Sequence, residues 1–105
     1  MQKYLLNMRV DVADEDDAVL LTVINEDTYN KLRKSKIAAT WGQMDDDPEF
    51  IAFSDIEDGW QCLRDSITVT PVTDAEVKLL ERLNVYASAG HFYFLDENGE
   101  DFDID

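Results

Sequence analysis

Hydrophobic and polar residues alternate at the start of the chain. This period of two residues predicts a half-buried β-strand over residues 3 to 12. A second run, residues 19 to 24, is apolar on both faces and rich in β-branched residues, which is typical of a central strand. The two segments together predict a hairpin. The inward positions expected for the first strand are Tyr4, Leu6, Met8, Val10 and Val12.

A helix is expected directly after the second strand. Asn25 is a favourable N-cap, and the two acidic residues that follow it suit the positive end of a helix dipole. We predict a helix from about 26 to 36, with Tyr29 and Leu32 facing inward. Residues 37 to 41 either continue this helix or form an extended segment, and the pattern leaves both open.

The middle of the chain predicts a short strand and a second helix. Residues 50 to 53 are mostly apolar, and Ser54 and Glu57 have the spacing of a capping box. A turn at Asp58 and Gly59 is the alternative to this helix. The apolar face of the helix would contain Ile56, Trp60 and Leu63.

A further strand and helix follow. Residues 67 to 72 predict a strand with Pro71 near its end, and Thr73 with Glu76 forms another capping-box pattern. The amphipathic pattern predicts that one face of the resulting helix is buried. The expected inward residues are Ala75, Leu79, Leu80 and Leu83.

These elements predict one domain over residues 1–105 of the α+β class. We expect a mainly antiparallel sheet of about five or six strands, with two or three helices packed on it. Residues 20–42 can also be aligned with residues 68–90. The alignment matches a predicted strand, a helix cap, a helix and a glycine in the two segments. This match is compatible with chance and with a duplicated unit, because only four positions are identical: Thr22/Thr70, Leu32/Leu80, Ala39/Ala87 and Gly42/Gly90.

Composition narrows the classes of function. The chain has 24 acidic and 9 basic residues, a formal net charge of -15, and 45% hydrophobic residues, enough to form a core. Such a charge repels phosphate backbones and anionic lipids, so direct nucleic-acid or membrane binding is not expected. A lone cysteine and the lack of a signal-like segment favour a cytoplasmic location. The exception is a short basic patch, interpreted as a solvated face: Lys31, Arg33, Lys34 and Lys36.

Residues suited to catalysis or metal binding are sparse. His91 is the only histidine, and no pattern joins it to Cys62 or to a serine, so we expect no catalytic centre and no cofactor. Calcium is the most reasonable metal for so acidic a chain. Aligning Gly99 with the glycine of an EF-hand loop, however, places Phe94 at the first ligand position. We therefore predict neither an enzyme nor a metal site.

The carboxyl-terminal segment carries the clearest functional pattern. Residues 92 to 95 and a returning strand that includes Phe102 and Ile104 flank Asn98 and Gly99, which predict a two-residue turn. Such a turn would place Leu95 opposite Phe102 and like charges opposite each other near the turn. Two explanations stay open, namely protection of an edge strand from aggregation and recognition of a partner. The acidic residues of this hairpin are Asp96, Glu97, Glu100, Asp101, Asp103 and Asp105.

Two further acidic stretches lie in predicted connections. The first contains Asp14, Glu15, Asp16 and Asp17, and the second contains Asp45, Asp46 and Asp47. Our leading hypothesis is a binding protein whose carboxylates mimic phosphates and inhibit or regulate a basic partner, such as a nuclease or nucleic-acid-binding protein. In size and charge the chain is similar to small acidic inhibitors, including phage-encoded nucleic-acid mimics and immunity proteins.

The alternative is an interaction or structural module whose acidity serves only solubility. It would use an aromatic surface, and a homodimer is possible. The aromatic residues considered for this surface are Trp41, Trp60, Phe92 and Phe94. An uncharacterised enzyme or calcium-binding protein is the third reading.

Overall fold

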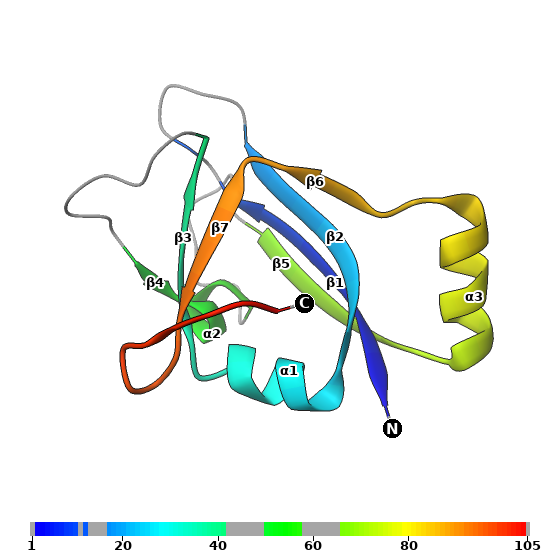
Figure 1. Ribbon diagram of the computed structural model, residues 1–105, viewed down its shortest axis with the longest axis horizontal. Coiled ribbons are helices and arrows are strands. Elements are labelled where there is room, and N and C mark those ends of the chain that lie inside the picture. Colours follow the sequence, from blue (N-terminus) through cyan, green and yellow to red (C-terminus); the bar gives the residue numbers. More distant parts are fainter. Residues whose placement is uncertain (1, 11, 13–16, 42–49, 58–65, 105) are drawn as a thin grey trace.

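The predicted hairpin forms the centre of the first of two antiparallel sheets. The computed structural model describes residues 2–10, 12, 17–41, 50–57 and 66–104. Strand β1 (Lys3–Val10) pairs along its whole length with β2 (Ala18–Asn25). Strand β5 (Ser66–Val72) lies on the other side of β1, and β6 (Ala87–Ala89) lies beyond β2 (Figure 1). Because β5 is an edge strand, Pro71 can occupy it without the N–H that a central strand would need.

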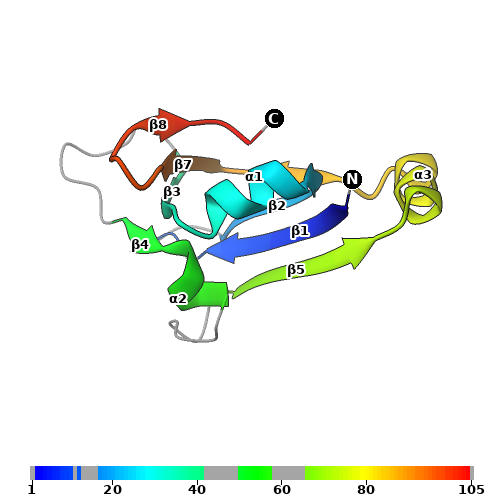
Figure 2. The same ribbon diagram turned by 90° about the horizontal axis from the view of Figure 1, so that it is seen from below.

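The second sheet has the order β4-β3-β7-β8. It consists of β3 (Lys36–Thr40), β4 (Ile51–Ala52), β7 (His91–Leu95) and β8 (Asp101–Phe102). Residues 37 to 40 are therefore extended, and this resolves the alternative that the sequence left open. Figure 2 shows β7 and β8 on one side of the molecule and β1 and β5 on the other.

Helix α1 (Glu26–Leu32) begins where the sequence predicts and ends earlier. The Asn25 side chain accepts a hydrogen bond from the Thr28 N–H at 2.8 Å, as an N-cap should. The expected extension to residue 36 is wrong because Ser35 closes the helix. Its hydroxyl donates to the Leu32 carbonyl at 2.7 Å, and its own carbonyl accepts the Phe53 N–H. The buried Ser35 is thereby satisfied and ties α1 to the next helix.

Helix α2 (Phe53–Glu57) is short and begins one residue before the predicted cap. Ser54 therefore lies inside the helix, and the predicted strand over residues 50 to 53 is reduced to β4. Phe53 starts the helix and points into the core. Trp60, Leu63 and the alternative turn at Asp58 and Gly59 lie outside the described residues.

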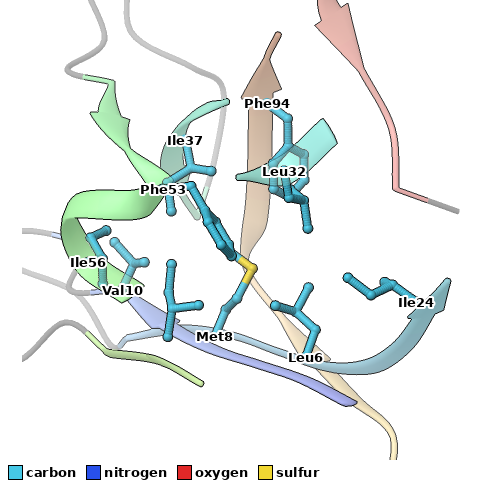
Figure 3. Packing of buried hydrophobic residues seen from close by; sticks show 10 residues of the cluster. Leu6, Met8, Val10, Ile24, Leu32, Ile37, Phe53, Ile56 and Phe94 are labelled. Atoms are coloured by element: carbon cyan, nitrogen blue, oxygen red, sulfur yellow. The ribbon is translucent and has the colours of Figure 1, made fainter. Parts of the chain in front are cut away.

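The core lies between the two sheets and is closed by α1 and α2. Leu6 and Met8 from β1, Leu32 from α1, Ile37 from β3 and Phe53 from α2 are all fully buried. Figure 3 shows the Phe53 ring directed toward the Met8 side chain. The inward positions predicted for β1 are thus confirmed for Leu6, Met8 and Val10, and Tyr4 packs against the same cluster.

Helix α3 (Asp74–Leu83) has the predicted capping box but not the predicted buried face. Val77 is its buried residue, whereas Leu79 is 48% exposed and Leu83 is 59% exposed. Figure 1 places α3 at one end of the molecule, beside the first sheet and away from the second. The helix therefore buries the side of its apolar face that carries Val77, and the side that carries Leu79 and Leu83 stays exposed.

The α+β class is confirmed, with three helices among the described residues and two sheets of four strands instead of one of five or six. The radius of gyration of 13.7 Å is close to the roughly 13 Å expected for a compact domain of this length. The strand-helix-strand units from β2 to β3 and from β5 to β6 share their local order. Their last strands nevertheless join different sheets. None of the described helices is long and apolar enough to cross a membrane.

Candidate functional site

The acidic hairpin between β7 and β8 has a three-residue connection. The Gly99 N–H donates to the Asp96 carbonyl at 3.0 Å, and the Asp96 N–H donates to the Glu100 carbonyl at 2.8 Å. Gly99 has a φ of 80°, in the left-handed region. These features define a turn centred on Glu97 and Asn98, followed by a glycine bulge. The predicted two-residue turn at Asn98 and Gly99 is wrong.

The longer connection shifts the register of the hairpin by one residue. Leu95 lies opposite Asp101, and Phe94 lies opposite Phe102, where the sequence predicted Leu95 opposite Phe102. The like charges that the predicted two-residue turn would place opposite each other are Asp96 with Asp101 and Glu97 with Glu100, and these pairs do not form. The apolar and acidic residues still separate, because Phe102 and Ile104 pack against the core while Asp101 and Asp103 are exposed.

The Asp96 side chain fixes the turn. Its Oδ1 accepts hydrogen bonds from the Asn98 N–H at 2.8 Å and from the Glu100 N–H at 3.0 Å. The hydrogen bond from Glu100 is the main cause that lowers the pKa of this carboxyl below its ordinary value; the bond from Asn98 and the positive charge of Lys31 add to it. Asp96 therefore acts first as a structural residue that holds the neighbouring carboxylates in place.

Helix α1 supports the inner side of the hairpin. The Lys31 ammonium lies 4.4 Å from the centroid of the Phe102 ring, and the Phe94 and Phe102 rings are 5.6 Å apart. The basic patch of the sequence is thus divided: Lys31 contacts the hairpin, and Arg33 lies over the Tyr29 ring. A depression of about 320 Å³ separates the helix from the turn. The residues that line it are all polar or charged: Asn30, Lys31, Lys34, Asp96, Glu97 and Asn98.

The structure brings together part of the predicted acidic site. Four exposed carboxylates share the hairpin, and within the described part of the chain no lysine or arginine forms an ion pair with them. They are Glu97, Glu100, Asp101 and Asp103. Asp17 stands apart, half-buried before β2, and has its own interaction partner. The remaining predicted residues lie outside the described ranges: Asp14, Glu15, Asp16, Asp45, Asp46, Asp47 and Asp105.

The described residues hold no candidate metal site. Across residues 2–10, 12, 17–41, 50–57 and 66–104 no three histidine, cysteine, aspartate or glutamate side chains gather as metal ligands. His91 is exposed at the start of β7, where it lies opposite Thr40. Cys62 lies outside the described residues.

The exposed apolar residues differ from those expected. Phe94 is only 5% exposed and Phe92 packs against the core, so this pair forms no open aromatic surface. Trp41 is 37% exposed, and Trp60 lies outside the described residues. Sequence reasoning missed the apolar surface of α3. The sequence did contain a signal for this surface. The apolar residues from Val77 to Leu83 extend over a wider part of the helix circumference than a single packing partner can cover.

The family models, the curated proteins and the solved structures that were compared with this chain gave no match.

Proposed function

We propose that this protein binds a basic protein through the carboxylates of its carboxyl-terminal hairpin and thereby inhibits or regulates that partner. The carboxylates would occupy positions that phosphates take when the partner binds nucleic acid. A nuclease or another nucleic-acid-binding protein fits this description. The observation that carries the proposal is the ordered, exposed group formed by Glu97, Glu100, Asp101 and Asp103.

Order in this group matters because an arginine or lysine gains most from an acceptor that is already in position. The turn is held by the two hydrogen bonds to the Asp96 carboxylate, and the strand is anchored by Phe102 and Ile104 in the core. Binding would therefore fix few additional backbone torsions on this side of the interface.

The net charge of the chain supports the same function. A formal charge of -15 attracts a basic partner over a distance and raises the association rate at low salt. Stability does not explain the acids at the turn, since neighbouring like charges on a hairpin cost up to about 1 kcal/mol. Edge protection explains Asp101 on β8 and Asp103 just after it, but not Glu97 and Glu100, which lie between β7 and β8.

The experiment begins with affinity capture from the native host at about 50 mM salt, followed by elution toward about 200 mM, the range over which phosphate-like contacts weaken strongly. Each captured basic protein is then purified and titrated with the wild-type chain in the presence of duplex DNA or RNA. We expect the chain and the nucleic acid to compete for one site. Simultaneous binding of both would contradict the phosphate mimicry.

A pair of matched variants locates the site. Glu100→Gln, Asp101→Asn and Asp103→Asn together remove three charges from the hairpin. Three substitutions elsewhere remove the same charge: Asp27→Asn, Asp55→Asn and Glu81→Gln. We expect at least tenfold weaker binding for the hairpin variant and a much smaller loss for the control, whose charges act only at long range. Equal losses in the two variants would reject the hairpin as the binding site.

A further inference from the structure

Strand β5 forms one edge of the first sheet and carries no charged residue. Its sequence from Ser66 to Val72 is SITVTPV, in a chain of which 31% of the residues are charged. Figure 2 shows β5 along the lower border of the molecule, next to β1. A long, uncharged edge strand offers its backbone groups to a strand of another molecule. β5 is therefore a candidate surface for pairing between chains.

The other edge strands of the two sheets are short or acidic. β4 and β8 contain two residues each, and β6 contains three. β8 also carries the exposed Asp101, and Asp103 follows it. β5 has seven residues, of which only Pro71 limits pairing. Among the sheet edges that the structure describes, β5 is thus the one whose length and charge permit association.

Pro71 shows which backbone groups of β5 point away from the sheet. It lies in the ladder with β1, so the side of its backbone that lacks an N–H faces away from β1. The Val72 carbonyl faces the opposite way, since it accepts a hydrogen bond at 3.2 Å from the Gln2 side chain, just before β1. These directions alternate along an antiparallel strand. The N–H and C=O groups of Ile67 and Val69 therefore point outward.

The central part of β5 is complementary to itself. Two antiparallel copies with a two-fold axis at Thr68 place this residue opposite itself. Ile67 then lies opposite Val69 of the second copy, and Ser66 lies opposite Thr70 of the second copy. Each hydroxyl side chain faces another hydroxyl, each β-branched aliphatic side chain faces another, and no charges meet. Pairs of this kind stabilise neighbouring strands.

The outward backbone groups select the same register. Ile67 and Val69 form the hydrogen-bonded pairs, in which the two residues exchange both N–H···O bonds. An axis at Val69 would instead place Ile67 opposite Pro71, which has no N–H to donate. The axis at Thr68 therefore uses the available donors and leaves Pro71 beyond the paired residues.

We infer that the protein forms a two-fold symmetric homodimer through antiparallel pairing of β5, with the axis at Thr68. The pairing joins the four-stranded first sheets of the two copies into one continuous sheet. Figure 2 shows β7 and β8 on the side of the molecule opposite β5, so both acidic hairpins stay accessible in the dimer. The dimer does not depend on the proposed binding of a basic partner.

The first test is the mass of the purified full-length chain by sedimentation velocity over a range of protein concentrations. We expect a species of twice the 12.1 kDa chain mass that becomes more populated as salt rises, because salt screens the repulsion between two chains of charge -15. Partner binding through the hairpin should weaken under the same change. A chain that stays monomeric at high concentration and high salt would overturn the inference.

Charge variants at Thr68 test the position of the axis. Thr68→Lys and Thr68→Glu each place like charges directly opposite each other, so each variant should associate at least about tenfold more weakly than the wild type. An equimolar mixture of the two variants places a lysine opposite a glutamate and should recover most of the lost affinity. A mixture that associates no better than the separate variants would contradict an axis at Thr68.

A matched control separates the interface from the general effect of charge. Ser88→Lys makes the same change at an exposed position of β6, the other edge strand of the first sheet, and should leave the dimer intact. Because Thr68 is exposed, both of its variants should keep the circular dichroism spectrum of the wild type. Equal weakening by Ser88→Lys and Thr68→Lys would exclude β5 as the interface.

Amide hydrogen exchange tests the backbone pairing residue by residue. In the wild type, the amides of Ile67 and Val69 should exchange more slowly at high protein concentration than at low concentration. The amides of Thr68 and Thr70 face β1 in both states and should change little. In Thr68→Lys the concentration dependence should be lost. Exchange at Ile67 and Val69 that is independent of concentration in the wild type would overturn pairing through this edge.

Discussion

Gly90 lies so close to Ala18 that a Cβ added to the glycine would come within 3.0 Å of the Ala18 Cβ. The same added carbon would be 3.2 Å from the Thr40 carbonyl oxygen. Gly90 joins β6 of the first sheet to β7 of the second and has a φ of 77°. The two sheets therefore meet at a backbone position that lacks both the space and the conformation for a side chain.

Gly90→Ala should destabilise the protein by about 2–5 kcal/mol, the sum of left-handed strain and overpacking against buried Ala18. Gly99→Ala is the matched control. Gly99 has nearly the same φ, 80°, but no heavy atom lies within 4 Å of its added Cβ. The control should therefore lose only about 1–2 kcal/mol. Urea unfolding of both variants measures the difference, and equal losses would show that the contact with Ala18 relaxes without cost.

The two well-formed N-caps should behave differently when removed. Asn25 caps α1, whose Leu32 is fully buried, whereas Thr73 caps α3, whose described packing depends mainly on Val77. Asn25→Ala should lower the free energy of unfolding by about 1 kcal/mol. Thr73→Ala should instead speed amide hydrogen exchange in residues 77 to 83 with little change in the urea midpoint. A global loss of equal size in the two variants would mean that α3 unfolds together with the core.

The Asp96 turn should make the hairpin sensitive to acid. Because the folded state lowers the pKa of this carboxyl, its ionised form stabilises the fold above the ordinary value of 3.8. That contribution is lost as the pH falls through the lowered pKa of the folded state. Asp96→Asn keeps an acceptor oxygen but cannot titrate. The stability advantage of the wild type over this variant should therefore shrink as the pH falls below about 4.

A ¹³C carboxyl titration provides a direct check on Asp96. Its midpoint in the folded protein should lie below 3.8, with the Asn98 and Glu100 amide signals moving at the same pH. Asp101→Asn serves as the control for unfolding measurements, since it removes a charge from the same hairpin without removing a turn hydrogen bond. A midpoint at or above 3.8 would show that the turn does not favour the charged form.

Local signals in the sequence predicted local structure well. Alternation located β1 and its buried residues Leu6 and Met8, and the capping patterns at Asn25 and Thr73 located the starts of α1 and α3. These signals succeed because they depend on groups within a few residues of one another. The separation of apolar and acidic residues along the last strand was predictable for the same reason.

The parts of the fold that the sequence did not predict depend on pairing between segments that are distant in the chain. Nothing local to residues 87 to 95 indicates that β6 joins β2 whereas β7 joins β3, which produces two sheets. The register of the acidic hairpin was also missed, because an Asn98–Gly99 pair suits both a two-residue turn and a bulged turn. The Asp96 side chain decides between them, and its two hydrogen bonds favour the longer connection. Which side of α3 is exposed was not predictable either, because it depends on where the helix packs against the first sheet.

Phe53 should be among the most sensitive positions in the core. Its side chain is fully buried and extends from α2 toward Met8 of the first sheet (Figure 3). Phe53→Ala should cost about 3–5 kcal/mol through lost burial and the cavity that remains, a large part of the roughly 5–15 kcal/mol that stabilises a typical domain. Leu83→Ala, at a position that is 59% exposed, should change the stability of the protein by less than about 0.5 kcal/mol. Chemical denaturation compares the two variants. Similar losses would contradict a core centred on Phe53 and place α3 in the cooperative unit.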